Sequence, residues 1–233
     1  MVLESFQNNK SPGNVGIPIE FYRKFLQLIS EPFTKCSNEC FEKGETSRSQ
    51  KQAVITLNEK MGKDGSLLEN WGPISLVNVD AKIMSKVTAT RLKNVLPQII
   101  HHNQAGFVKD RYGGETVHSI FDIMHFMAEE NLPGLMIFID FQKAFDTIKW
   151  SYLQRCSESF NFGPEFIRWF MTFDNNIQNC VINNGITSDY FTLERGVKQG
   201  DSTLSISIRS SCRNNGYCSM SKYIDRRNYH RKG

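Results

Sequence analysis

The sequence predicts an α+β fold, because helical and strand patterns occur in different parts of the chain. Apolar residues recur every three or four positions over residues 80–96 and 115–130, which is typical of amphipathic helices. The unbroken apolar run Leu135–Ile139 indicates a buried central strand, since a strand covered on both faces shows no alternation. Asn184 and Gly185 separate two extended segments and predict a hairpin turn.

The first eighty residues predict one helix and a pair of extended segments. Residues 17–29 carry apolar side chains at helical spacing, with Pro18 tolerable in the first turn. The polar stretch 38–52 is expected to be a loop. Residues 53–57 favour a short strand, and a Gly-Lys-Asp-Gly turn at 62–65 leads to a second extended piece at 74–77.

The two amphipathic stripes in the middle of the chain predict core helices. The first has Asp80 available as N-cap and Pro97 as a stop signal. The second runs from Glu115 to Glu130. Both apolar stripes are expected to pack in the core rather than to bind a ligand.

The apolar run 135–139 ends abruptly in Asp140, which is the most informative position of the chain. Burial of a carboxylate at the end of a central strand is unfavourable unless a cation or hydrogen-bond donors compensate it. Asp140 therefore indicates a bound metal, a basic partner or the N-cap of a following helix, and the strand alone does not choose between them.

Beyond this strand, the sequence predicts two helices, a hairpin and a glycine-rich loop. One helix covers residues 150–160, and a second begins at Gly163 and Pro164. The hairpin spans residues 179–187, and residues 189–193 form the returning strand. It leads into the loop 196–201, where two glycines allow close approach of the backbone to a ligand.

Composition is that of an ordinary soluble protein, with 39% hydrophobic and 22% charged residues. We expect an intracellular protein without a membrane partner, since no apolar run of eighteen residues and no signal-peptide core occurs. The six cysteines show no Cys-x-x-Cys spacing and are expected to be reduced. Residues 206–233 hold seven of the 28 basic and one of the 24 acidic residues, and this tail is expected to be disordered.

Several sequence blocks stand in one characteristic order. They are Lys10–Gly13 with Ile19–Tyr22, Asn70–Lys82, His101–Val108, the Asp140 strand with Ala144–Asp146, and Arg195–Asp201. Together they resemble the reverse transcriptases of LINE-type, non-LTR retrotransposons, over roughly residues 10–205. Blocks in register are far more specific than any one of them alone.

The resemblance implies the fingers and a partial palm of a right-hand polymerase, with an incomplete palm sheet. Its predicted regions are an N-terminal helical segment and loop (1–52), a fingers-like region (53–131), a partial palm (132–205) and the basic tail (206–233). It also implies an RNA template, a DNA primer and deoxynucleoside triphosphates as partners, with Mg²⁺ as cofactor. The oligomeric state is left open.

Site residues follow from the matching motif positions. The resemblance implies that Asp140 is the catalytic carboxylate and binds Mg²⁺, with the carbonyl group of Phe141 as a further ligand. Phe145 matches the residue that contacts the sugar, and from the residues alone it reads equally well as a core phenylalanine. Gln199 and Gly200 match the motif beside nucleotide and template, although a plain turn after the hairpin fits them too. Arg111 resembles a basic fingers residue near the phosphates, against the ordinary alternative of a solvated arginine.

The chain departs from the family pattern in ways that predict loss of activity. The Ala-Asp-Asp hairpin that supplies the remaining metal-binding carboxylates is absent from the sequence. The pattern changes within a few residues of Ser205, which indicates a shift of reading frame. Gly72 stands where the family usually has arginine. We therefore expect a polymerase fragment that is inactive alone and, with an uncovered palm strand, marginally stable.

Two other functions compete with this interpretation. In a magnesium phosphohydrolase, Asp140 would be the nucleophile, but the second aspartate usual two residues later is replaced by Gln142. In a non-enzymatic nucleic-acid-binding remnant, the basic tail with its tyrosines would contact phosphates and stack on bases. A frame-shifted tail that is basic by chance explains the same composition.

Overall fold

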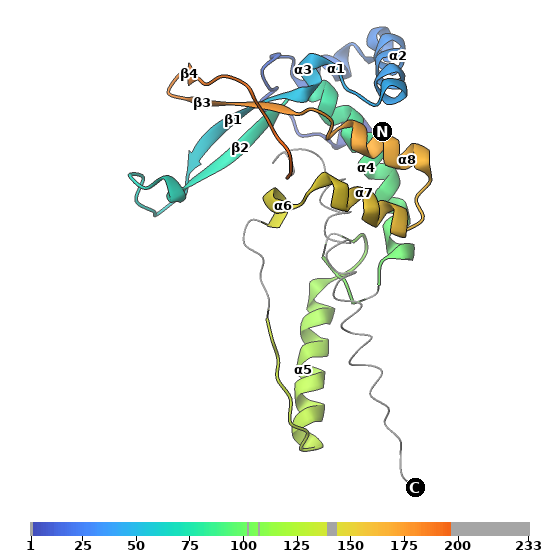
Figure 1. Ribbon diagram of the computed structural model, residues 1–233, viewed down its shortest axis with the longest axis vertical. Helices are drawn as coiled ribbons and strands as arrows, with labels where there is room; N and C mark the ends of the chain where they lie inside the picture. Colours follow the sequence, from blue (N-terminus) through green and yellow to red (C-terminus); the bar gives the residue numbers. More distant parts are fainter. Residues whose placement is uncertain (1, 102, 107, 139–143, 197–233) are drawn as a thin grey trace.

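The computed structural model describes residues 2–101, 103–106, 108–138 and 144–196. Within these residues the elements follow one another as helices, a strand pair, a long helical stretch and a final hairpin (Figure 1). The helices are α1 (Ile19–Lys24), α2 (Leu26–Lys43), α3 (Arg48–Lys51), α4 (Val79–Ile99), α5 (Gly113–Glu129), α6 (Ala144–Thr147), α7 (Trp150–Ser159) and α8 (Pro164–Thr172), with 3₁₀ turns η1 (Val2–Ser5) and η2 (Leu68–Asn70). The strands are β1 (Gln52–Glu59), β2 (Trp71–Val77), β3 (Gln178–Asn183), β4 (Ile186–Thr187) and β5 (Phe191–Thr192).

One sheet organises the described part of the chain, with strand order β2-β1-β3-β4 and β5 paired with β3. β1 is antiparallel to β2 and parallel to β3, and its Ala53 lies opposite Val77 on one side and Asn179 on the other. The predicted hairpin is confirmed: β3 and β4 are antiparallel, and both Asn184 and Gly185 have positive φ, as a tight primed turn requires.

Helix α4 links the sheet to the helical layer. Its N-terminal half packs on the sheet through Ala81, which clusters with the buried Ala53 and Val77. Its C-terminal half packs against α7 and α8 in the largest apolar cluster, formed by Ala89, Leu92, Leu96, Ile100, Val108, Leu153, Cys156 and Phe170. The prediction that the first amphipathic stripe lies in the core is therefore confirmed.

Two predicted boundaries of α4 are wrong. The N-cap is Asn78 rather than Asp80, and its buried side chain accepts a hydrogen bond from the Val15 amide and donates one to the Ser49 carbonyl group. Pro97 does not stop the helix, which continues to Ile99. A proline in the last turn removes only one helical hydrogen bond, so its cost there is small.

The predicted loop 38–52 is wrong in its first and last parts. α2 continues to Lys43 and ends at Gly44, whose φ of 67° suits a helix C-cap. The ring of Phe41 holds this last turn against α8, because it stacks on Trp169 at a centroid distance of 4.8 Å, and Cys40 in the same turn is buried. Tertiary contacts thus extend a helix that the polar sequence does not favour.

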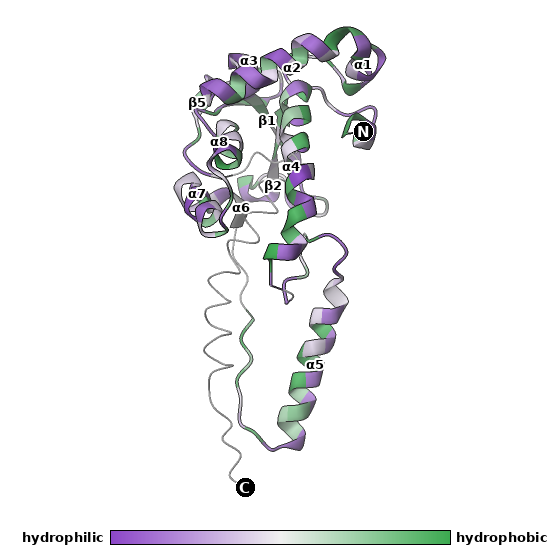
Figure 2. Cartoon of the chain, turned by 90° about the vertical axis from the view of Figure 1, so that its right-hand side faces the viewer, coloured by the Kyte–Doolittle hydropathy of each residue, from purple (hydrophilic) through white to green (hydrophobic). Residues whose placement is uncertain are grey.

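The helix predicted at 115–130 forms as α5, but it does not lie in the core. α5 points away from the sheet, and the chain after it runs back alongside (Figure 1). We call residues 113–138 the arm. Figure 2 shows apolar positions along α5, and none of its residues is buried.

The buried strand predicted at 135–139 is also wrong where the structure describes it. Leu135 is 85% exposed and Phe138 is 78% exposed, and residues 132–138 form no strand. Five consecutive apolar residues show that a segment is suited to burial, but burial also needs elements that cover both of its faces. In the described sheet β1 pairs with β2 and β3, and no described strand pairs with residues 132–138.

Candidate functional site

A pocket of about 400 Å³ lies on the sheet face that also carries Ala53. Side chains at alternate positions of a strand share a face, so the sheet register places Ile55, Ser75 and Asn179 together on this side. The pocket is completed by α6 and the segment after β5. Its lining residues are Ile55, Pro73, Ser75, Asp146, Asn179, Thr192, Leu193, Glu194, Arg195 and Gly196.

Backbone contacts join the two segments that close this pocket. The Gly196 amide donates to the Ile148 carbonyl group at 3.0 Å, and the Trp150 indole N–H donates to the Gly196 carbonyl group at 3.0 Å. Lys149 and Arg195 form an isolated antiparallel bridge beside them. The end of α6 and the beginning of the glycine-rich loop are therefore held side by side.

Gly196 is required for this close approach. Its φ is +88°, and a Cβ atom there would lie 3.0 Å from the Asp146 carbonyl oxygen. A larger residue would suffer both the left-handed backbone conformation and the steric contact. The sequence predicts that the glycines of this loop let the backbone approach a ligand closely. In the structure, Gly196 closely approaches the backbone of Asp146 and Ile148.

The pocket combines charged and apolar groups. Asp146, Glu194 and Arg195 lie at its exposed side, whereas Ile55 and Pro73 provide an apolar wall. The guanidinium group is suited to pair with phosphate, and the carboxylates accept hydrogen bonds from hydroxyl or amino groups. Such a lining fits a ligand with both a flat apolar part and charged oxygens.

Most predicted site residues lie outside the described residues: Asp140, Phe141, Gln199 and Gly200. Phe145 lies in α6, and only its backbone is described. The described flanks are nevertheless adjacent, since Asp146 and Gly196 line one pocket. In the described part of the chain, no group of three His, Cys, Asp or Glu side chains is arranged to hold a metal ion. The metal ligands Asp140 and Phe141 stay a prediction.

Arg111 lies away from this pocket, at the C-terminal end of α4. Its guanidinium group donates to four carbonyl groups at 2.6–3.0 Å, those of Pro97, Ile100, His101 and Gln104. These carbonyl groups belong to the end of the helix and to the turn after it. Arg111 thus closes α4, and its predicted role near phosphates stays a prediction.

None of the lining residues was among the predicted site residues, and Asp146 and Asn179 show why. Asp146 belongs to the quoted motif Ala144–Asp146, so the sequence held a signal for it. Asn179 has no such signal, because one asparagine at the start of a hairpin strand fits many structures. Only the register between β1 and β3 places it in the pocket.

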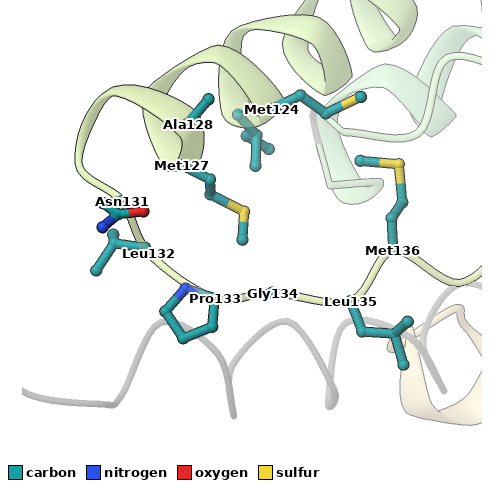
Figure 3. Close-up of a pocket in the computed structure, with 10 residues that line it drawn as sticks. Met124, Met127, Ala128, Asn131, Leu132, Pro133, Gly134, Leu135 and Met136 are labelled. Atoms are coloured by element: carbon teal, nitrogen blue, oxygen red, sulfur yellow. The ribbon is translucent and has the colours of Figure 1, made fainter.

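A second pocket, of about 550 Å³, lies in the arm (Figure 3). Met127 points from α5 toward Gly134, and Met124 and Met136 face the same space. A Cβ atom at Gly134 would collide with the end of the Met127 side chain. No charged residue lines this pocket, so it lacks the groups that chemistry on a nucleotide would need.

Comparison with known proteins identifies the family. Residues 59–225 match the family described as reverse transcriptase (RNA-dependent DNA polymerase). The chain belongs to this family. The match includes β2, α4, the segments that close the sheet pocket and the glycine-rich loop.

A transposon protein supports the subgroup. The chain is 35% identical over 198 residues to the "Transposon TX1 uncharacterized 149 kDa protein" of Xenopus laevis. The alignment covers 85% of this chain and 15% of that protein. The predicted resemblance to reverse transcriptases of non-LTR retrotransposons is therefore confirmed, and so is a mixed α and β fold with a partial sheet. Among the described helices, none has the length and apolar character needed to cross a membrane.

Proposed function

We propose that this chain is the fingers and partial palm of an RNA-directed DNA polymerase from a non-LTR retrotransposon. The main support is the contact between Gly196 and residues 146–148. It brings the motif ending at Asp146 and the motif beginning at Arg195 to one pocket. In this proposal residues 53–131 correspond to fingers and residues 132–205 to the first part of the palm. The RNA template, DNA primer and deoxynucleoside triphosphate approach the sheet pocket.

The proposed chemistry of the parent protein depends on a metal-binding carboxylate close in sequence to the pocket residue Asp146. Asp140 lies six residues before Asp146, and we assign it, with the Phe141 carbonyl group, as a Mg²⁺ ligand. Asp140 and the Phe141 carbonyl group would hold Mg²⁺, and the ion would supply activation of the primer hydroxyl group and stabilisation of the leaving pyrophosphate. Gln199, Gly200 and Phe145 position the incoming nucleotide and template.

We further propose that the chain alone binds nucleic acid but does not polymerise. The Ala-Asp-Asp motif is absent from its sequence, so a two-metal site would have one of its three carboxylates. Without the other two, little negative charge holds the ions against the repulsion between them.

The test is primer extension on an RNA template with Mg²⁺, comparing the chain with Asp140→Ala. We expect no incorporation above the level of the variant. Robust incorporation that the substitution abolishes would disprove the proposed inactivity and support the assigned metal ligand. Covalent phosphorylation of Asp140 by a phosphoryl donor would instead support the phosphohydrolase alternative.

Binding of a primer–template duplex tests the family role separately. We expect the affinity for the duplex to fall as the salt concentration rises. The same salt dependence should persist after removal of residues 206–233, because fingers and palm supply phosphate contacts. Binding that disappears with residues 206–233 would favour the non-enzymatic remnant, in which only the basic tail contacts nucleic acid.

A further inference from the structure

Asn179 presents an unsatisfied polar group at the sheet pocket. The residue is 1% exposed, and its Oδ1 atom has no hydrogen-bond partner among the described residues. Gln104 Oε1 is the other buried side-chain atom in this state in the described part of the chain, and it lies away from the pocket lining. Burial of an amide oxygen without a donor is unfavourable, so native structures rarely keep one without a reason.

The register of the sheet places this side chain toward the pocket. Asn179 pairs with Ala53 of β1, and the alternation along the strands puts both on the face of Ile55 and Ser75. Ile55, Ser75 and Asn179 all line the pocket. The neighbouring Ala53 and Val77 are covered by α4, so Asn179 lies at the boundary between the core and the pocket.

The other lining groups indicate what chemistry would meet this acceptor. Arg195 offers a guanidinium group for phosphate, while Ile55 and Pro73 provide a surface for a flat base or a sugar. A volume of about 400 Å³ has the size of a small-ligand site. Asn179 is buried at the pocket, whereas Arg195 is exposed. We therefore expect Asn179 to face a part of the ligand other than the phosphates.

We infer that Asn179 is a specificity-determining residue, whose Oδ1 accepts a hydrogen bond from an N–H or O–H group of a nucleotide bound in this pocket. The inference rests on the proposed function and names a contact within its nucleotide site. The donor is either an amino group of the base or a hydroxyl group of the sugar, which both offer the same chemistry. An amide acceptor selects for ligands with a donor at that point, since a ligand lacking it leaves the acceptor buried and unpaired.

The experiment measures equilibrium binding of three triphosphates to the full chain by calorimetry. ATP carries both donors, 2′-deoxy-ATP lacks the 2′-hydroxyl group, and purine riboside triphosphate lacks the 6-amino group. We expect one of the two analogues to bind about fivefold to tenfold more weakly than ATP, the loss for one neutral hydrogen bond. The weaker analogue identifies the donor.

Asn179→Leu removes the acceptor and keeps the branched shape of the side chain. In this variant ATP should bind no better than the weaker analogue does, while the thermal midpoint should stay equal or rise, because a buried unpaired oxygen is lost. Asn179→Ala should show the same loss of discrimination if leucine does not fit. Asn183→Leu, at the exposed end of the same strand, is the matched control and should leave discrimination unchanged.

Unchanged discrimination in folded Asn179→Leu and Asn179→Ala would overturn the inference, and Asn179 would then be a residue of the core alone. Absence of binding by all three triphosphates to the unsubstituted chain would overturn it as well. Neither result would affect the proposed polymerase ancestry, because binding of the primer–template duplex tests it independently.

Discussion

Arg111 holds the C-terminal end of α4 through four main-chain carbonyl groups. The last carbonyl groups of a helix have no partner within it, and a planar guanidinium group can reach several at once. A single residue thereby fixes where the long helix ends and where the following turn begins.

Arg111→Lys should destabilise the fold although it keeps the charge. A lysine ammonium group cannot reproduce a fork that reaches four acceptors, and we expect a loss of about 1–3 kcal/mol in the free energy of unfolding. Urea unfolding followed by circular dichroism measures it. Arg155→Lys, on the exposed side of α7, is the control and should change little. Equal stability of both variants would show that the carbonyl contacts do not support the helix end.

Gly72 lies on β2 at a position where the family resemblance implies an arginine, and the alternation along the strand places a side chain there on the sheet face opposite the pocket. Its backbone is not in the left-handed region, and a Cβ atom there would meet the Asn58 carbonyl oxygen at an ordinary 3.7 Å. We expect Gly72→Arg to fold and to bind a primer–template duplex about threefold to tenfold more tightly, with a salt dependence steeper by about one phosphate contact.

Fluorescence anisotropy at several salt concentrations tests the Gly72→Arg prediction. Gly163→Arg adds the same charge before α8, where nothing lies within 4 Å of the new Cβ atom. If both variants gain affinity equally, net charge rather than a phosphate contact at position 72 explains the effect.

Tyr22 should make stability depend on alkaline pH. Burial, and secondarily the charge of Asp80, raises the pKa of Tyr22 from its usual 10.0 to about 12. Between these values the phenol is ionised in the unfolded chain and protonated in the fold, so unfolding releases a proton and stability falls as pH rises. Below pH 10 the contribution is fully present. Urea unfolding across this range should show a shallower decline for Tyr22→Phe, and identical slopes would contradict the assignment.

Among the elements, α4, α7 and α8 together form the largest apolar cluster of the described residues. Leu153 of α7 is fully buried in this cluster, and its neighbours come from all three helices. We expect Leu153→Ala to cost about 2–5 kcal/mol, since it leaves a cavity that three packed helices cannot fill. Denaturant unfolding measures the cost. Leu68→Ala, at a position 76% exposed, should cost little; a similar cost at both positions would disprove tight packing of α7.

Most helices and strands could be predicted from short sequence patterns, because backbone preferences and side-chain periodicity act between residues close in sequence. The Asn184–Gly185 turn, the Gly163–Pro164 helix start and the stripe of α4 all follow from backbone preference or periodicity. The C-terminal turn of α2 could not be predicted this way. It depends on Phe41 meeting Trp169, a residue more than a hundred positions away.

The candidate site was predictable only in part for the same reason. A motif match drew attention to residues 144–146 and 195–201, and the structure brings their described parts together. Asn179 enters the site through strand register, which depends on long-range pairing with β1. An apolar stripe likewise shows which face of α5 is suited to burial, but not whether an element covers it.

The arm leaves a large apolar surface of the molecule exposed. Eight of its large apolar side chains are half or more exposed: Val117, Phe121, Ile123, Met124, Phe126, Leu135, Ile137 and Phe138. Contiguous apolar surface of this extent is uncommon on stable monomers and promotes association. This exposed apolar surface is a structural reason to expect the marginal stability that the sequence predicts.

We expect the purified chain to bind a hydrophobic dye strongly and to associate as its concentration rises. Ile137→Lys and Phe138→Lys together should lower both dye fluorescence and association, because they place charges on an exposed extended segment, while leaving the thermal midpoint nearly unchanged. Dye titration and sedimentation velocity measure the two effects. Leu68→Lys, at an exposed position outside the arm, controls for added charge. A monodisperse monomer with a cooperative, high-temperature melt and no dye binding would show that the arm's apolar face is covered in solution.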